Sequence, residues 1–383
     1  MPLEVTAEAC YHEGRNFVCE FLTRPEHSKR IRTFDITFTS WNPSPGKMAP
    51  LEPSHQLSEL THYPQLTSLE WVDARSMNPP DFQHSPLLSA PRLRSLSFQG
   101  CAWLDKLPNI SNLTSFTFAG SSVDEATFRV FLQNNPSLET LSLDKVRFKG
   151  DSDQEPVVLS NLKSLTVKWP RSDSFGFYFH VPAFRRLSSL SYSIKLGVNN
   201  QDKLHATGKG IALTLESKYD LISEAWRHLT GYVKPTFERV RFENLGLIQY
   251  NLSGRLSVLN DLFAGAHTLE ISHDCNRLYP YLWGTVLERV MPQLRTIRFE
   301  LPGNAKGCPG QSTGSVDGCD PQGSGLLDDI EKILGNFKVP WPSVERLVTT
   351  SESESVNRKQ ELVWQRIHND LLSQCPDAQW APR

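Results

Sequence analysis

Residues 121–146 read SSVDEATFRVFLQNNPSLETLSLDKV, and they contain the pattern that decides the fold. Ser122 is a good helix N-cap, and the acidic residues that follow it suit the positive end of a helix. The next apolar residues are at helical spacing: Ala126, Phe128, Phe131 and Leu132. Pro136 ends the helix, and apolar positions typical of a short strand follow it: Leu138, Leu141 and Leu143. The stretch therefore predicts a helix and then a strand with the pattern N-P-x-L-x-x-L-x-L.

The L-x-x-L-x-L part of this pattern recurs along the chain. Copies read YPQLTSLEW, APRLRSLSF, ISNLTSFTF, NPSLETLSL, LSNLKSLTV, FRRLSSLSY, KPTFERVRF, MPQLRTIRF and WPSVERLVT. Their first apolar residues are Leu66, Leu93, Leu113, Leu138, Leu162, Leu187, Phe237, Leu294 and Val344. Weaker copies lie at Ile31, near Gly210 and near Ala266. Because the copies follow one another in order, they indicate an internal repeat and not chance matches.

The distances between copies identify the class of repeat. From Leu66 the steps to the next five anchors are 27, 20, 25, 24 and 25 residues. These steps agree with the period of about 20–29 residues of leucine-rich repeats. The gap of 50 residues between Leu187 and Phe237 is two periods, and the copy near Gly210 fills it. We therefore expect an α/β leucine-rich-repeat solenoid, a ribonuclease-inhibitor-like horseshoe with a parallel sheet on its concave face and helices and irregular segments on its convex face.

A solenoid accommodates the whole chain in one domain. The 383 residues exceed the roughly 250–300 at which single compact cores stop growing, but stacked repeats share one continuous core. We predict a single repeat domain over 1–383, with convex-side helices at 55–62 and 282–290. The Gly-, Ser- and Pro-rich residues 303–325 are expected to form a flexible loop insertion. The amphipathic residues 357–374 are expected to form a helix that caps the last repeat.

Charge and composition argue against several classes of function. The chain has 40 basic and 42 acidic residues and a formal net charge of −2, which gives no reason to expect a nucleic-acid or membrane partner. No apolar run approaches the roughly 18 residues of a transmembrane helix, and the N-terminal sequence lacks the features of a secretory signal. The seven cysteines are scattered and odd in number, which suits reduced thiols. We therefore expect a cytoplasmic or nuclear protein.

The sequence contains no convincing catalytic or metal site. Residues 310–314 match G-x-S-x-G, but that motif acts only on a tight strand-to-helix turn, and Ser312 lies in the predicted loop. Cys308 and Cys319 in the same loop are either free thiols, the interpretation we favour, or partners in a disulfide or metal site. No P-loop, dinucleotide-binding motif or H-E-x-x-H motif occurs. We expect no cofactor, no metal and no enzymatic activity.

Outward positions flank the second and third apolar residues of each copy and define the exposed face of the predicted sheet. In the first half of the chain they are mostly small hydroxyl residues: Ser68, Glu70, Ser95, Ser97, Ser115, Thr117, Thr140, Ser142, Ser164, Thr166, Ser189 and Ser191. In the second half they become larger and charged: Arg239, Arg241, Glu243, Thr268, Glu270, Thr296, Arg298, Glu300 and Arg346. The face therefore changes from small and neutral to large and charged.

The charged positions have two interpretations. In the first they bind a partner, since arginine forks onto carboxylates and phosphates and is enriched in interface hot spots. The candidate partner-binding residues are then Arg239, Arg241, Glu243, Glu270, Arg298, Glu300 and Arg346. In the second, Arg241, Glu270 and Arg298 are lateral neighbours that satisfy one another in solvent. The hydroxyl rows likewise are either a contact surface or residues that simply suit closely packed parallel strands.

The repeat region resembles that of fungal F-box proteins with leucine-rich repeats. Residues 121–146 carry the likeness best, and it covers roughly residues 28–350. In that family an N-terminal F-box helix bundle docks the adaptor of a cullin ubiquitin ligase, and the repeats hold the substrate. The resemblance implies a non-catalytic scaffold for a protein partner or ubiquitination substrate, with a cullin ligase adaptor as a further partner if an F-box lies upstream.

The N-terminal residues depart from that family. Residues 1–28 are too short for an F-box and lack its leucine–proline opening. The alternative is therefore a stand-alone repeat scaffold or regulator that has no ubiquitin role. An enzyme is a distant third.

Overall fold

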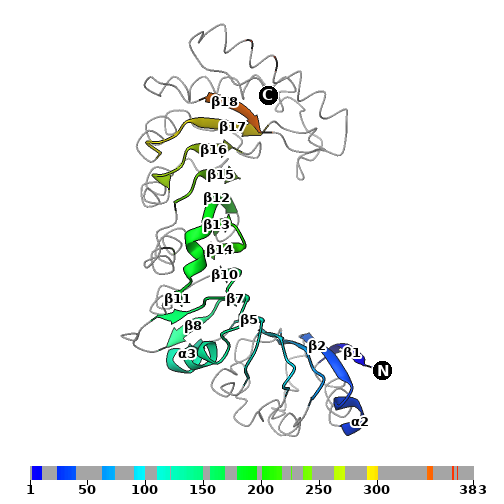
Figure 1. Ribbon diagram of the computed structural model, residues 1–383. Coiled ribbons are helices and arrows are strands. Elements are labelled where there is room, and N and C mark those ends of the chain that lie inside the picture. The colour runs from blue at the N-terminus through cyan, green and yellow to red at the C-terminus, as the bar shows by residue number, and fades with distance from the viewer. Residues whose placement is uncertain are drawn as a thin grey trace, which may run out of the picture. The chain divides into compact units, whose positions relative to one another are not determined.

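The computed structural model in Figure 1 divides into two compact units, and each is described here by itself. Unit 1 comprises Met1–Arg186 and Gly210–Lys234, and unit 2 comprises Leu187–Lys209 and Pro235–Arg383. The residues that the structure describes are 2–10, 24–39, 63–73, 90–99, 110–120, 122–149, 156–168, 179–195, 201–217, 226, 236–243, 263–271, 291–300, 343–347, 365 and 369.

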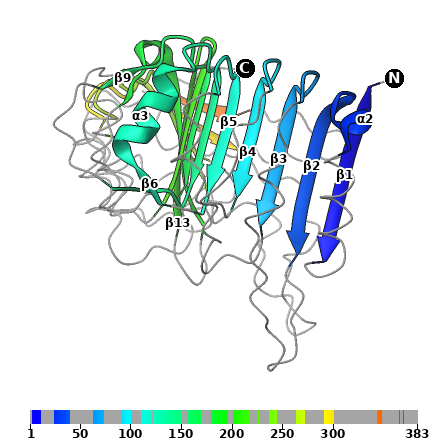
Figure 2. The same ribbon diagram turned by 90° about the horizontal axis from the view of Figure 1, so that it is seen from below.

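Unit 1 contains a large parallel sheet. Its strands, in spatial order, are β1 (Leu3–Cys10), β2 (Ile31–Thr39), β3 (Ser68–Asp73), β4 (Ser95–Gln99), β5 (Ser115–Ala119), β7 (Thr140–Asp144), β10 (Ser164–Lys168) and β14 (Ile211–Ser217). Each neighbouring pair among these strands is parallel. Figure 2 shows β1 to β5 side by side, with the helix α3 (Glu125–Gln133) on one side of the sheet.

Unit 2 contains a sheet that is mostly parallel. Its strands, in spatial order, are β13 (Gln201–Gly208), β12 (Leu187–Lys195), β15 (Arg239–Glu243), β16 (Thr268–Ile271), β17 (Thr296–Glu300) and β18 (Ser343–Leu347). The strands β12 and β13 pair antiparallel. From β12 to β18 each pair is parallel.

Short elements complete the described fold. They are the helices α2 (Pro25–Ser28) and η4 (Pro182–Arg186), and the strands β6 (Ser122–Asp124), β8 (Arg147–Lys149), β9 (Val157–Val158) and β11 (Phe179–His180). The strands β6 and β8 form one small parallel pair, and β9 and β11 form another. The described chain is thus dominated by parallel sheet and has few helices. None of its helices is long and apolar enough to cross a membrane.

Alternating burial along the strands separates a core face from an exposed face. In β4, β5 and β7 every second residue is buried. The register stacks these buried residues from strand to strand: Leu69, Leu96, Phe116, Leu141, Leu165 and Leu213. The helix α3 covers this apolar face, because Phe131 approaches Phe116 with 4.6 Å between ring centroids. Burial of the apolar rows is the main force that stabilises the sheet.

A tight turn recurs immediately before the strands. The amide of Leu66 donates a hydrogen bond to the carbonyl of Tyr63, three residues earlier, at 3.2 Å. In the same way the amide of Leu138 donates to the carbonyl of Asn135 at 3.1 Å. Further examples are Leu93 to Ala90, Leu162 to Leu159, Ala266 to Phe263 and Leu294 to Met291. Four of the donor residues are buried leucines, and each is the first apolar residue of its sequence copy: Leu66, Leu93, Leu138 and Leu162. These six copies therefore share a turn as well as a strand.

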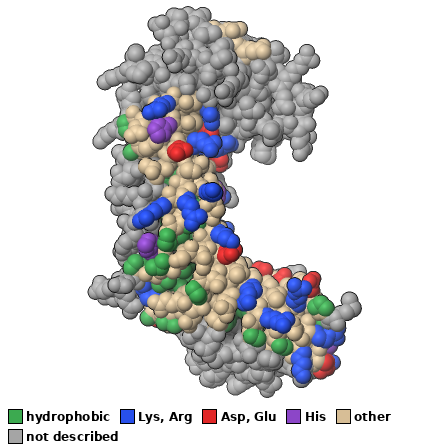
Figure 3. Space-filling view, viewed as in Figure 1, with side chains coloured by type: hydrophobic (Ala, Val, Ile, Leu, Met, Phe, Trp, Pro, Cys, Tyr) green, Lys and Arg blue, Asp and Glu red, His purple; other side chains and the backbone are tan. Residues whose placement is uncertain are grey.

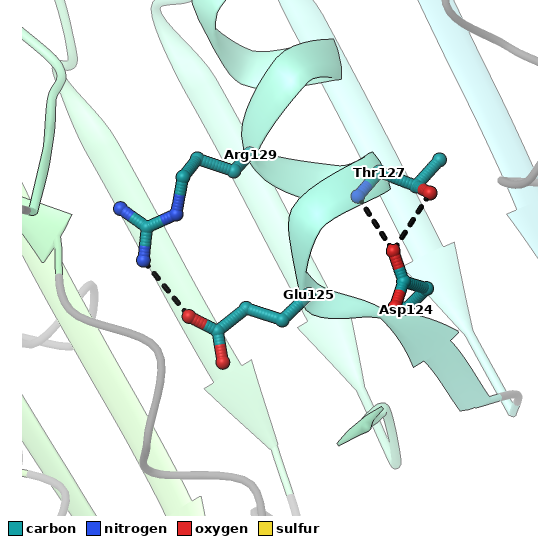
Figure 4. Close-up of polar contacts among 4 residues, drawn as sticks. All are labelled: Asp124, Glu125, Thr127 and Arg129. Carbon is teal, nitrogen blue, oxygen red and sulfur yellow. Dashed lines mark hydrogen bonds and ion pairs between the residues drawn. The ribbon is translucent and has the colours of Figure 1, made fainter. Parts of the chain in front are cut away.

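The helix α3 starts later than the sequence suggested. Asp124, and not Ser122, is the N-cap, and its Oδ2 accepts from both the amide and the hydroxyl of Thr127 at 2.8 Å (Figure 4). Ser122 belongs instead to β6, where the buried Val123 favours an extended backbone. The helix ends as predicted before Pro136, with Asn134 as its C-cap.

Strand order departs from chain order after β10. A simple solenoid pairs each strand with the next copy, but β10 pairs with β14, which is formed by the copy near Gly210. The copy at Leu187 becomes β12, which pairs with β13 and β15. The strand β13 has no counterpart in the predicted repeat.

The last copy has a different alignment from the predicted one. The register pairs Val344 with Ile297 and Arg346 with Phe299. Val344 therefore occupies the second apolar position of its copy and not the first. The predicted helices at 55–62 and 282–290 and the loop at 303–325 lie outside the described residues, as does the capping helix at 357–374 except for its helical residues 365 and 369.

Candidate functional site

The exposed face of the unit 1 sheet carries two rows of hydroxyl side chains, which we call the hydroxyl face. The first row consists of Thr33, Ser68, Ser95, Ser115, Thr140 and Ser164. The second consists of Ser97, Thr117, Ser142, Thr166 and Thr214, preceded on β2 and β3 by Asp35 and Glu70. All of these side chains are partly exposed. The rows include every unit 1 position that the sequence assigned to this face.

The geometry of the hydroxyl face suits contact with a flat polar surface. Neighbouring parallel strands lie about 4.8 Å apart, so each row repeats at that spacing. Every hydroxyl both donates and accepts hydrogen bonds. Short Ser and Thr side chains also lose little rotational freedom when a partner covers them. The face is therefore a regular array of short side chains that can form hydrogen bonds.

The exposed face of the unit 2 sheet is organised in corresponding rows. One row runs through Thr207, Ser189, Arg239, Thr268, Thr296 and Ser343. The next, which we call the charged row, runs through His205, Ser191, Arg241, Glu270, Arg298 and Glu345. Basic and acidic residues alternate from Arg241 to Glu345. The sequence placed Arg241, Glu270 and Arg298 side by side, and the register agrees.

Ion pairs with carboxylates offset the positive charges of the two arginines in the charged row, Arg241 and Arg298. Arg298 Nη1 lies 3.4 Å from Glu270 Oε1 on the neighbouring strand. Arg241 Nε lies 2.9 Å from Oε1 of Glu243, two residues along the same strand. These contacts, one between neighbouring strands and one along a strand, favour local charge compensation over a preformed site for an anionic ligand, because each guanidinium already has a carboxylate partner.

The other candidate residues are spread over different rows. Arg239 is exposed and stands between Ser189 and Thr268. Glu300 shares a register position with Leu347. Arg346 does not join the charged row, because it is paired with Phe299, and Glu345 takes the place next to Arg298. The candidates on β15, β16 and β17 therefore lie on neighbouring strands but in different rows.

His205 begins the charged row, and sequence reasoning missed it. Its strand partner is Ser191. Burial lowers the pKa of His205, and the positive charge of Lys203 lowers it further, against a smaller opposite effect of Glu243. The histidine is therefore neutral over most of the physiological pH range. The alternation of apolar Leu204 and Ala206 with polar Lys203, His205 and Thr207 is the sequence signal that could have revealed this strand.

Asp144 lies at the end of β7, beside Lys168 of β10. Among the described residues, no group donates a hydrogen bond to its buried Oδ1. Burial raises the pKa of Asp144 above the usual 3.8, although Lys145 and Lys168 act in the opposite direction. The carboxylate is therefore less favourable in the folded chain than in the unfolded one.

We expect Asp144→Asn to raise the melting temperature at neutral pH. Because the pKa is higher in the folded state, Asp144 contributes stability at low pH and loses that contribution as the pH rises through its folded pKa. The amide avoids this loss, so the gain should be largest at pH 7 and absent below about 3.8, the ordinary pKa. Thermal unfolding from pH 3 to pH 8 measures the difference. A gain that does not depend on pH would contradict the electrostatic cause.

The described residues contain no group of three or more His, Cys, Asp or Glu side chains that could hold a metal ion. The sequence motif around Ser312, with Cys308 and Cys319, lies outside the described residues. No protein-family model matches the chain, and no curated protein matches it in sequence.

Proposed function

We propose that this chain is a leucine-rich-repeat solenoid that binds a protein partner on the exposed face of its parallel sheet and catalyses no reaction. The observation that carries the proposal is the hydroxyl face, in which one type of side chain occupies the same register position on strand after strand. Sheet faces built from repeats serve as extended binding surfaces. The turn that recurs before β3, β4, β7, β10, β16 and β17 also supports a repeat architecture.

Two biological settings are compatible with this proposal. In the first, the partner is a substrate for ubiquitination, as the resemblance to F-box repeat proteins implies, and an F-box upstream or in trans supplies the link to a cullin ligase adaptor. In the second, the chain is a stand-alone scaffold or regulator. We place either in the cytoplasm or nucleus, and we propose neither a nucleic-acid nor a membrane partner.

The variant Thr117→Arg tests the proposed binding face. Thr117 is partly exposed in the middle of the hydroxyl face, between Ser97 and Ser142. A long, charged side chain there should prevent close contact without disturbing the buried face of β5. We expect at least a tenfold loss of partner recovered by affinity capture from cell lysate, with an unchanged melting temperature. Quantitative mass spectrometry of the captured proteins measures the loss.

Val158→Lys provides the matched control. Val158 lies on β9 and is 54% exposed, away from the hydroxyl face. We expect this variant to capture the partner as the parent chain does. Equal capture by Thr117→Arg and the parent would reject the hydroxyl face as the binding surface. Recovery of a cullin ligase adaptor with the partner would favour the ubiquitin setting, and its absence the stand-alone one.

A further inference from the structure

Basic side chains gather at the edge of unit 1 where its first strands begin. We call this set the basic edge, and its members are Arg24, Lys29, Arg30, Arg32, Arg92 and Arg94. All of them are exposed. Within residues 24–32 and 90–94 the only carboxylate is that of Glu26, and on the neighbouring strand β1 the exposed Glu4 stands beside Thr33. Figure 3 shows this edge at its lower right, where blue Lys and Arg side chains gather.

Backbone hydrogen bonds hold the basic edge together. The amide of Thr67 donates to the carbonyl of Arg32 at 2.8 Å, and the amide of Arg94 donates to the carbonyl of Thr67 at 2.9 Å. Arg32 and Arg94 therefore stand two strands apart, about 10 Å at the usual strand spacing. The turn after α2 adds Lys29 and Arg30 to the same edge, since the amide of Arg30 donates to the carbonyl of His27 at 2.8 Å.

Neutral groups hold two of these arginines in place. Arg92 Nη1 donates to Oε1 of Gln65 at 2.6 Å. Arg94 Nη1 donates to the carbonyls of Leu93 and Asn112, both at 3.2 Å. These acceptors orient the guanidinium groups but do not cancel their charge. Further along the same edge, Lys163 is neutralised by Glu139 at 2.7 Å, so the positive charge is concentrated near β2 and β4.

We propose that the basic edge binds an extended acidic polypeptide segment laid across the starts of β2, β3 and β4. The inference rests on the proposed function, and it adds the chemistry of the partner. Side chains on one face of an extended peptide recur about every 6.6–7 Å. The arginine side chains are long, so guanidinium groups whose backbones lie about 10 Å apart can reach peptide side chains at the shorter spacing. Each guanidinium can then form two parallel hydrogen bonds to a carboxylate or phosphate group.

A polypeptide fits this edge better than a nucleic acid does. Single-stranded nucleic acids bind through stacking on exposed aromatic side chains, but the aromatic residue of the turn before β3, Tyr63, is 2% exposed. A long polyanion also interacts with the field of the whole chain, whose net charge is −2. A short acidic segment interacts with the local cluster only.

Fluorescence anisotropy with synthetic peptides tests the proposal on the full chain. The probes are a labelled twelve-residue Glu/Ser peptide, its phosphoserine version and a neutral Gly/Ser peptide of equal length. We expect the two anionic peptides to bind and the neutral one not to bind, with affinity that falls as salt is added. Arg32→Glu/Arg92→Glu should raise Kd at least tenfold, whereas Arg147→Glu/Lys149→Glu, with the same charge change on β8, should raise it less than threefold.

Several outcomes would overturn the proposal. They are binding of the neutral peptide as tight as that of the anionic ones, equal losses in the two variants, and tighter binding of a single-stranded oligonucleotide of equal charge. Circular dichroism checks that both variants are folded, and Arg32→Lys/Arg92→Lys, which keeps the charge but not the forked geometry, should lose less affinity than Arg32→Glu/Arg92→Glu. If acidic peptides fail to bind while partner capture still depends on Thr117, this inference fails and the proposed function stands.

Discussion

Asn135→Ala is expected to lower the free energy of unfolding by about 3–5 kcal/mol, because the change leaves several buried backbone groups without partners. Asn135 is fully buried. Its Oδ1 accepts from the amide of Leu113 at 2.9 Å, and its Nδ2 donates to the carbonyls of Ile110 at 2.9 Å and Phe131 at 2.8 Å. One side chain thus joins the end of α3 to the turn before β5. Urea unfolding followed by circular dichroism measures the loss.

Asn161→Ala is the matched control for Asn135→Ala. Asn161 lies in the corresponding region of the next copy and donates from Nδ2 to the carbonyl of Pro136 at 2.9 Å, but it is exposed. Water can replace that bond, so we expect a loss of about 1 kcal/mol or less. Similar losses for the two substitutions would show that burial of the Asn135 amide is not the cause.

Arg129→Met is expected to lower the free energy of unfolding by about 3–5 kcal/mol, the usual effect of removing one partner from a buried ion pair. Arg129 Nη2 lies 2.8 Å from Glu125 Oε1 one turn earlier on α3, and both side chains are almost fully buried (Figure 4). Without the guanidinium, the Glu125 carboxylate is left in an apolar environment. Chemical unfolding of the variant measures the effect.

The double variant Glu125→Met/Arg129→Met separates the lost ion pair from lost packing. Methionine fills much of the same volume and needs no ionic partner, so the double variant should be at least about 2 kcal/mol more stable than Arg129→Met. Lys163→Met should cost about 1 kcal/mol or less, because the pair of Lys163 with Glu139 is largely exposed. A double variant as unstable as the single one would contradict an uncompensated charge as the cause.

The parallel strands and their exposed positions could be predicted from the sequence, because each repeats a local pattern. Leu93, Leu96 and Phe98 are all buried, while Ser95 and Ser97 between them are partly exposed. Such alternation follows directly from strand geometry. One observation about a single copy therefore applied to the others, and from β2 to β10 and from β15 to β18 the neighbours across the sheet followed from the order of the copies.

Other features depended on information that a repeat pattern does not contain. The antiparallel strand β13 has no L-x-x-L-x-L motif, and its position beside β12 depends on tertiary contacts that the local sequence does not specify. The start of α3 depends on whether Ser122 forms part of β6, where it pairs with Arg147 of β8, or caps the helix. The local sequence is compatible with both. In the last copy, WPSVERLVT offers two apolar alignments three residues apart, and only pairing with β17 distinguishes them.

The candidate site could be predicted only as a set of positions. The sequence indicated that Arg241 and Arg298 face outward, but it left open whether they bind a partner or pair with carboxylates of neighbouring residues in the same sheet. Two contacts in the structure, Arg298 to Glu270 and Arg241 to Glu243, bear on that choice. Side-chain pairing depends on rotamers and on lateral register, which a single sequence does not specify.

The pairing of β10 with β14 has a consequence for how the protein is made. The ribosome delivers residues from the N-terminus onward, so residues 187–209, which belong to unit 2, emerge before the strand that completes unit 1. Until Ile211–Ser217 is synthesised, β10 presents an open edge, and open edges of this kind recruit other strands. A nascent chain that pauses between residues 168 and 217 therefore carries an open strand edge that can mispair, and a chaperone that covers this edge would favour correct folding.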